Sequence, residues 1–209
     1  KSKCPVTDAW MESIFGPEII KLLWQVMGVA IHPSMGFQKA VALIGGGLNG
    51  KGTFLRLCHA LLPDSAICAI DPKVLTSNRF ASAELFGKTA NICGDIERFT
   101  FNSTAEFKKI TGEDIINAER KNGHPFTFQS EATMLFSGNK MPASRDTSHG
   151  WFRRWLIIPM NCTIQGPPDR TLNERMKEEL DGVLFRAVMG LREAMEQGGF
   201  DEPLICKEA

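Results

Sequence analysis

A run of glycines that ends in a lysine is the feature that most constrains this chain. Residues 45–51 read GGGLNGK, which matches the pattern G-x-x-x-x-G-K. The apolar segment Ala40–Ile44 precedes the run, and a helical segment from Gly52 to Leu62, ended by Pro63, follows it. A glycine loop between a strand and a helix presents backbone N–H groups to phosphate oxygens. The sequence therefore predicts a nucleotide-binding P-loop, and the alternative is a structural glycine turn.

The residue after the lysine departs from the usual pattern. Lys51 is expected to reach the β- and γ-phosphates of a nucleotide, while the hydroxyl residue that normally follows it is replaced by Gly52. Thr53, one residue later, either takes over magnesium, contacts another phosphate, or leaves the metal to water and an acidic residue elsewhere. The predicted nucleotide-binding residues are Gly45, Gly46, Gly47, Leu48, Asn49, Gly50, Lys51, Gly52, Thr53 and Phe54.

Short apolar runs alternate with polar helical segments along most of the chain. Runs that are continuously apolar are typical of strands buried in a mostly parallel sheet covered by helices. Two helices are expected before the first strand, one capped by Thr7 and ending at Phe15, the other from Glu18 to His32. The predicted strands are Ala40–Ile44, Ala66–Ile70, Thr89–Cys93, Thr133–Phe136 and Trp155–Ile158.

The later helices carry their own start and stop signals. Ser103 and Glu106 are spaced as a capping box, and Leu172–Gln197 reads as a helix with a break at Asp181-Gly182. A short helix is also expected near Ser82–Phe86. We expect an N-terminal helical segment over 1–36, a P-loop ATPase core over 37–165 and a C-terminal helical segment over 166–209.

Two acidic residues follow the third predicted strand. Asp95 and Glu97 come just after an apolar run, where an α/β sheet presents ligand-binding residues. If the strand continues, residues two apart share a face. Asp95 is predicted to hold magnesium and Glu97 to activate water, because hydrolysis of a phosphoanhydride needs both tasks. The alternative is a solvated loop with two ordinary acids.

Three further side chains are candidates for the same reaction. Asn139 ends the fourth strand and is predicted to orient water and sense the γ-phosphate, the alternative being a turn-forming Asn before Met141-Pro142. Arg153 and Arg154 precede the last strand. Arg154 is predicted to stabilise the transition state across a subunit interface, with Arg153 as its substitute, and a surface salt bridge is the alternative.

A hairpin is predicted between the last core helix and the fourth strand. Ile115–Gln129 contains two apolar-alternating arms around Asn122-Gly123, a strong hairpin signal. Its tip is basic and is a candidate for contact with nucleic acid, although charged tips are often merely solvated. The candidate DNA-binding residues are Lys121, Arg120, Asn122 and His124.

Composition limits the classes of protein that fit this chain. Its 209 residues predict one domain with an appendage, and 43% hydrophobic with 23% charged residues is typical of globular proteins. Because 24 basic residues balance 24 acidic ones, any contact with nucleic acid must be local.

The same composition bears on membranes, metals and processing. The most hydrophobic stretch, Ile19–Ile31, is interrupted by Lys21 and Gln25, so no membrane anchor is expected. The six cysteines lack zinc-ligand spacing and read as reduced thiols of a cytoplasmic protein. The chain begins at Lys1 without a signal-type apolar core and is expected to be part of a longer protein.

Taken in order, the motifs resemble the superfamily 3 helicase domain of phage and plasmid primase-helicases, which belong to the AAA+ class of P-loop ATPases. The likeness extends to a lead-in segment from Cys4-Pro5 to His32 and to a closing segment of Glu179–Leu184 with Phe200–Pro203. The motif segments are Gly45–Thr53, Asn91–Glu97, Phe107–Asp114 with the hairpin, Leu135–Asn139 with Pro142, and Trp151–Trp155.

This resemblance implies a fold and a function. The fold would be an AAA+-like P-loop NTPase with a five-stranded, mostly parallel sheet, a β-hairpin insertion and flanking helices. The protein would form a ring, commonly a hexamer, that hydrolyses ATP with Mg²⁺ at subunit interfaces and moves single-stranded DNA through its pore in the 3′ to 5′ direction. The hairpin residues around Lys121 would line that pore. A covalently linked primase domain and the cytoplasm of a bacterial host are further implications.

Two other classes of function stay open. Gly52 at the hydroxyl position is compatible with a ring-forming module that binds nucleic acid with weak or no ATPase activity. A P-loop kinase acting on a small molecule is the third possibility. The kinase should be active as a monomer and indifferent to DNA, whereas the motor should need assembly and respond to single strands.

Overall fold

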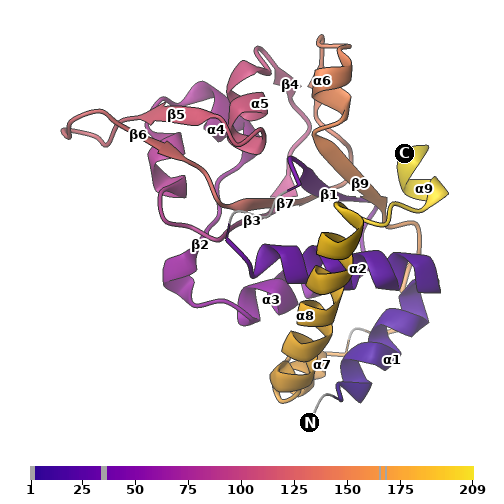
Figure 1. Cartoon of the computed structure of the whole chain (residues 1–209). Coiled ribbons are helices and arrows are strands. Elements are labelled where there is room, and N and C mark those ends of the chain that lie inside the picture. The colour runs from indigo at the N-terminus through magenta and orange to yellow at the C-terminus, as the bar shows by residue number, and fades with distance from the viewer. Residues whose placement is uncertain (1–2, 34–36, 165, 168) are drawn as a thin grey trace.

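A five-stranded parallel sheet organises the chain (Figure 1). The computed structural model describes residues 3–33, 37–164, 166–167 and 169–209. The sheet has the order β2-β3-β7-β1-β9, which confirms the predicted α/β class and the strands of the sheet. Its strands are β1 (Ala40–Ile44), β2 (Ile67–Cys68), β3 (Ala90–Ile96), β7 (Thr133–Gly138) and β9 (Trp155–Pro159).

The strand that precedes the glycine loop lies inside the sheet. β1 pairs with β7 on one side and with β9 on the other, and Ile44 is in register with both Gly138 and Pro159. Gly138 is also in register with Ile96 of β3. Because these strands are parallel, their carboxyl ends meet at one edge of the sheet. The residues that follow β1, β3 and β7 are therefore brought together there.

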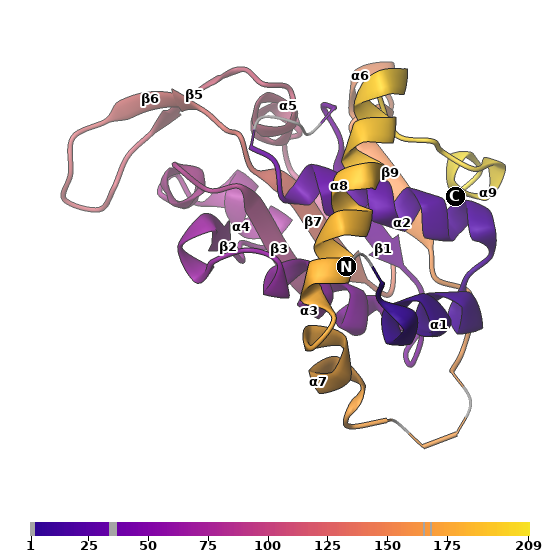
Figure 2. The same cartoon turned by 60° about the horizontal axis from the view of Figure 1, so that its bottom comes forward.

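Helices from the two ends of the chain cover one face of the sheet (Figures 1 and 2). In Figure 1 the apolar helix α2 lies below the strands, and α8 crosses it. The two helices can approach closely because Gly190 has no side chain. A Cβ at this position would lie only 2.5 Å from the Trp24 carbonyl oxygen. The helices of this layer are α1 (Pro5–Ile14), α2 (Pro17–Ala30), α3 (Lys51–Ala60), α7 (Leu172–Lys177) and α8 (Leu180–Gln197).

The opposite face carries a second, more aromatic core. Phe107 stacks on Trp155 with ring centroids 4.7 Å apart, and Trp151 contacts both rings. Alternate residues of β1 serve the two cores, as expected for a strand buried on both faces. Short elements surround this core: α4 (Pro72–Ser77), α5 (Ala105–Thr111), α6 (His149–Phe152), β4 (Thr100–Phe101) and β8 (Ala143–Ser144), the last two paired with each other; α9 (Leu204–Lys207) packs against β9.

The predicted hairpin projects from the body of the molecule (Figure 1). β5 (Ile115–Ala118) pairs antiparallel with β6 (Phe126–Gln129), which confirms the hairpin. Asn122 has a positive φ of 64°, as its place before Gly123 suggests. The pairing ends at Ala118 and Phe126, however, so residues 119–125 form a longer loop than a two-residue turn.

Several predicted helix boundaries were wrong. Thr7 lies inside α1 instead of capping it, because the Glu179 carboxylate accepts hydrogen bonds from the backbone N–H groups of Val6 and Thr7. The helix expected near Ser82–Phe86 is a 3₁₀ helix, Ala81–Leu85. At Thr7 the cause is a partner distant in sequence, Glu179, which supplies the acceptor that a cap would otherwise provide.

Two further corrections concern capping and a helix break. Thr104, not Ser103, precedes α5, and the Ser103 hydroxyl accepts from Ala105 N instead of forming a capping box. Gly182 is inside α8, where a Cβ would lie 2.3 Å from the Lys3 carbonyl oxygen, and the break falls between α7 and α8 at residues 178–179. In the described residues, no helix has the length and apolar character needed to cross a membrane.

Candidate nucleotide-binding site

The glycine loop is fixed to the ends of the strands beside it. Gly45 N donates to Gly138 O at 3.1 Å, and Met160 N donates to Ile44 O at 2.7 Å. The buried Asn49 side chain donates to Met160 O at 2.9 Å. A Cβ on Gly45 would lie 2.3 Å from that same carbonyl oxygen, so this position requires glycine. The loop is thus held between β7 and β9 before any ligand binds.

The loop leads into α3 through a left-handed turn. Leu48 and Gly50 have φ values of 56° and 85°, and α3 begins at Lys51. Phe54 N donates to Gly50 O at 2.9 Å, and the Phe54 side chain is fully buried. The N–H group and the side chain of Phe54 are therefore both engaged within the protein, and a contact of this residue with the nucleotide stays a prediction. Gly46 and Gly47 have open space where a Cβ would project, which leaves their backbone accessible.

The Lys51 ammonium is bound by the loop itself. Nζ donates to Gly45 O at 2.6 Å, to Gly46 O at 2.5 Å and to Asn49 Oδ1 at 3.0 Å. Burial lowers the pKa of Lys51, and the nearby Asp95 carboxylate opposes that shift. The Asp95 carboxylate is therefore near enough to affect the pKa of Lys51.

The predicted acids and the predicted amide line one cavity. The β3–β7 pairing shifts register between Cys93 and Ile96, and Asp95 within this bulge has φ 52°. Asp95 N donates to the Ser137 hydroxyl at 3.3 Å. Asp95, Glu97 and Asn139 all line a cavity of about 280 Å³. The bulge breaks the regular alternation expected for a continuing strand, but both acids still face this cavity.

Two basic residues of this cavity escaped the sequence prediction. Arg98 and Lys140 line it beside Asp95, Glu97 and Asn139. Each of them directly follows a predicted site residue in the sequence. That position next to Glu97 or Asn139 is the feature from which their place in the cavity could have been predicted. They add positive charge beside the two carboxylates.

Arg56 lies over the start of α3. Its Nη2 donates to Thr53 Oγ1 at 3.2 Å, and its Nη1 lies 3.2 Å from the place where a Cβ on Gly52 would be. Thr53 is half-buried and Arg56 is exposed. Arg56 was not predicted as a site residue. Because residues four apart are neighbours on a helix surface, its contact with Gly52 could have been predicted from the sequence.

The two predicted arginines have opposite environments. Arg154 is only 7% exposed, and Nη1 donates to Gln38 Oε1 at 2.7 Å and to Thr111 O at 3.3 Å. Burial lowers its pKa. Arg153 is exposed. Of the two, Arg153 is the one whose side chain lies at the surface.

Both arginines lie at the amino end of β9, whereas the glycine loop follows the carboxyl end of β1. The sheet separates them from the loop of their own chain.

The hairpin tip combines basic and aromatic side chains. Lys121, Asn122 and His124 are exposed. The Arg120 guanidinium lies 5.3 Å from the ring centroid of Phe126 and 5.9 Å from that of Phe86. Arg120 is therefore partly engaged with aromatic rings, whereas Lys121 is the basic residue of the tip with no such partner among the described contacts.

A larger cavity, of about 530 Å³, is lined by Arg56, Asp64 and Glu174 among others. Two further large cavities border α1. One of about 610 Å³ is mainly apolar and adjoins the glycine loop at Leu48, with Trp10, Ile14 and Ile164 in its walls. This cavity could not be predicted from the sequence, because its walls come from segments far apart in the chain.

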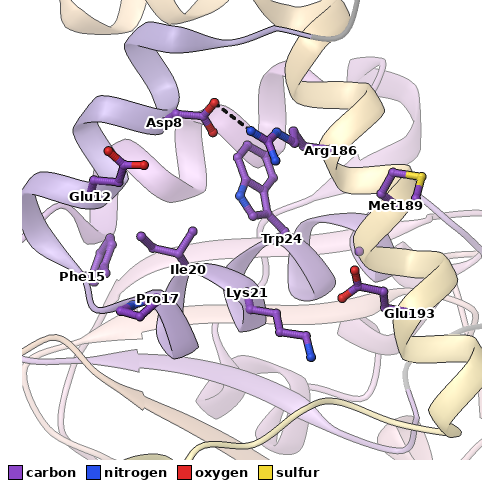
Figure 3. Close-up of a pocket in the computed structure, with 11 residues that line it drawn as sticks. Asp8, Glu12, Phe15, Pro17, Ile20, Lys21, Trp24, Arg186, Met189 and Glu193 are labelled. Atoms are coloured by element: carbon purple, nitrogen blue, oxygen red, sulfur yellow. Dashed lines mark hydrogen bonds and ion pairs between the residues drawn. The ribbon is translucent and has the colours of Figure 1, made fainter.

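The other cavity, of about 520 Å³, lies between α1, α2 and α8 (Figure 3). It contains the Asp8–Arg186 ion pair at 3.0 Å and none of the predicted site residues.

Comparison with known proteins gives one family. Residues 43–154, just over half of the chain, match the family described as "Family of unknown function (DUF5906)". The match begins in β1 and ends at Arg154, so it includes the glycine loop, the acids at the end of β3 and the hairpin.

Curated relatives come from African swine fever virus. The protein named "Putative primase C962R" from isolate Warthog/Namibia/Wart80/1980 is 26% identical over 172 residues, which cover 78% of this chain and 18% of that protein. The protein of the same name from isolate Pig/Kenya/KEN-50/1950 gives the same figures. The chain thus spans about a fifth of the length of these relatives.

Solved structures share the fold. A structure described as the A form apo structure of the NrS-1 C-terminal region has a TM-score of 0.70 at 14% identity, covering 100% of this chain and 50% of that chain. A second apo structure of the same region has a TM-score of 0.68 at 13% identity, covering 95% and 52%. At these identities the likeness concerns the fold.

Proposed function

This chain belongs to the DUF5906 family of unknown function, and we propose a function for it. We propose that it is an ATP-dependent motor of the AAA+ class that moves along single-stranded DNA during replication. The likeness to viral proteins named as primases supports a role in replication. Because the chain spans 18% of those proteins, we propose that a linked primase domain lies elsewhere in the full-length protein.

The observation that carries this proposal is the meeting of three strand ends at one edge of the sheet. The glycine loop with Lys51 follows β1, Asp95 and Glu97 lie at the end of β3, and Asn139 follows β7. An anion-binding loop, carboxylates and an amide in this arrangement are the parts that phosphoryl transfer to water requires. The electrostatic link between Lys51 and Asp95 supports one common site.

Each residue then has a task. The N–H groups of Gly46 and Gly47 bind phosphate oxygens, and the Lys51 ammonium exchanges the loop carbonyls for the β- and γ-phosphates. Glu97 takes a proton from the attacking water, and Asn139 orients that water. The base is proposed to occupy the apolar cavity beside Leu48.

The residues present fit a magnesium ion. Asp95 is an exposed carboxylate, the kind of hard oxygen ligand that Mg²⁺ prefers. When bound with ATP, Mg²⁺ would neutralise charge that develops on the phosphates. Asp95 is the ligand we propose from this chain.

We propose that ATP hydrolysis is coupled to DNA through the hairpin and through assembly of the subunits into a ring. Lys121 at the exposed tip contacts the DNA backbone, and Arg153 acts on the ATP of a neighbouring subunit in a ring. Because the sheet lies between Arg153 and its own glycine loop, action in the same chain is geometrically unsuited.

ATP hydrolysis measured with and without single-stranded DNA, alongside solution mass, tests this proposal. The motor should assemble, hydrolyse ATP faster with single strands and lose turnover in Lys51→Ala. Turnover by a monomer that ignores DNA would favour a small-molecule kinase. Assembly with DNA binding but no turnover would favour a binding module and contradict the motor.

A further inference from the structure

The Arg56 guanidinium fills the space in which a P-loop hydroxyl would project. Helical side chains lean toward the N-terminus, so a residue four positions on can cover the preceding turn. Arg56 does this over Gly52, with Nη1 and Cζ at 3.2 and 3.8 Å from an ideal Cβ. In other P-loops the hydroxyl at this position binds the magnesium ion. In this chain the positively charged Arg56 guanidinium occupies the place where that hydroxyl would lie.

Arg56 also engages the remaining hydroxyl. Thr53 Oγ1 accepts a hydrogen bond from Arg56 Nη2 at 3.2 Å. One lone pair of that oxygen is therefore used, and a divalent cation bound to it would lie close to the guanidinium. Repulsion between two cations disfavours that arrangement. Thr53 is thus a poor magnesium ligand while Arg56 holds this position.

The Arg56 charge is available to an anion. Arg56 is exposed, and within the described ranges of the chain no carboxylate lies within ion-pair distance of it. A guanidinium binds phosphate oxygens through two parallel N–H donors and stays charged at all working pH values. Its position beside Gly52 adjoins the start of α3, where phosphate would bind.

We propose that Arg56 binds phosphate oxygens of the nucleotide held by its own chain, and that this contact lets the nucleotide bind without magnesium. The inference rests on the proposed nucleotide site and adds a nucleotide-binding residue to it. Magnesium is then needed for turnover through Asp95, while affinity depends mainly on Lys51 and Arg56. Thr53 is not a metal ligand in this scheme.

Calorimetric titration with the non-hydrolysable ATP analogue AMP-PNP, in excess magnesium or in EDTA, tests the inference. The unsubstituted chain should bind with affinities that differ by less than about threefold between the buffers, since the arginine supplies the charge. Arg56→Gln should lower affinity in EDTA by about tenfold or more, because a charge-assisted contact is lost. Arg56→Lys should recover part of that loss.

Controls separate this inference from the proposed site. Arg192→Gln removes an exposed arginine of α8 and should bind like the unsubstituted chain. Thr53→Val should leave the small effect of magnesium unchanged. Binding by Arg56→Gln equal to that of the unsubstituted chain in EDTA, or loss of all binding by the unsubstituted chain in EDTA, overturns the inference alone. No binding in either buffer, or normal binding by Lys51→Ala, overturns the nucleotide site and the inference with it.

Discussion

At the scale of single residues, the glycine loop binds its own lysine. Lys51 donates to two carbonyl oxygens and to Asn49, so its ammonium is already compensated within the loop. Phosphate oxygens would replace these weaker neutral acceptors, because hydrogen bonds between ionised partners are stronger. We expect nucleotide binding to move Lys51 out of its contacts with Gly45 and Gly46.

The two metal-ligand candidates can be ranked by substitution. We predict that Asp95→Asn lowers magnesium-dependent turnover at least about tenfold, because a charged oxygen ligand is lost. Thr53→Ala should lower turnover less than about threefold, since its hydroxyl is held by Arg56. Steady-state hydrolysis across a magnesium titration measures both, and the reverse ranking would assign the metal to Thr53.

Residue identity could be predicted from the sequence only where a motif fixes the geometry. The glycine loop, Asp95, Glu97 and Asn139 follow strands directly, so their meeting at one sheet edge followed from parallel topology. Which of the adjacent residues Arg153 and Arg154 is exposed did not follow from the topology. It depends on which of the two side chains is buried beside Gln38, and that is Arg154. Arg56 was missed because its role depends on the missing side chain at Gly52.

At the scale of elements, we propose that the hairpin contacts DNA while the chemistry takes place at the edge of the sheet. Lys121 lies at the exposed end of an arm that projects from the sheet (Figure 1). We predict that Lys121→Ala weakens single-stranded DNA binding and reduces the slope of log affinity against log salt by about 1, while hydrolysis without DNA is unchanged. Fluorescence anisotropy across a salt titration measures this.

A matched lysine checks the specificity of that effect. Lys207→Ala removes an exposed lysine on α9 and should leave both affinity and salt dependence unchanged. Equal behaviour of the two variants would mean that the hairpin tip is only solvated.

The crossing of α2 and α8 depends on a missing side chain. A methyl group on Gly190 would lie 2.5 Å from backbone atoms of Trp24 and 2.7 Å from Gln25 N, so one helix must move. We predict that Gly190→Ala lowers the free energy of unfolding by about 1–3 kcal/mol. Gly199→Ala, where nothing lies within 4 Å, should change it by less than about 0.5 kcal/mol. Urea unfolding measures both, and equal effects would contradict close packing at this crossing.

Element types were more predictable than element ends. Apolar periodicity located the strands of the parallel sheet and the hairpin arms, because burial on both faces leaves a local signal. It failed at Thr7 and at Asp181-Gly182, where Glu179 and the backbone of Lys3 supply contacts across the whole length of the chain. Such long-range partners leave no local pattern.

At the scale of the whole molecule, both ends of the chain join in one helical layer against the sheet (Figure 2). The α1 N-terminus is bound by Glu179, and Gln25 accepts from Asp201 N at 2.8 Å. The N- and C-terminal helical segments therefore contact each other directly. Their packing next to the glycine loop forms the apolar cavity at Leu48.

Action between subunits gives a further prediction. Arg153→Ala and Lys51→Ala should each be nearly inactive alone, and mixing them should restore part of the turnover, because some interfaces then pair an intact loop with an intact arginine. Arg154→Ala should instead lower thermal stability, since it leaves Gln38 and Thr111 O without their buried partner. Mixed rings without recovered turnover, or full activity of Arg153→Ala alone, would contradict the assignment.

Strand displacement is the measurement that tests the motor most directly. A duplex with a 3′ single-stranded tail on the loading strand is incubated with the protein and ATP, and release of the complementary strand is followed by fluorescence. The account predicts release that requires ATP and the 3′ tail and that is absent in Lys51→Ala. No release by assembled protein that binds DNA and hydrolyses ATP, or equal release by Lys51→Ala, would contradict it.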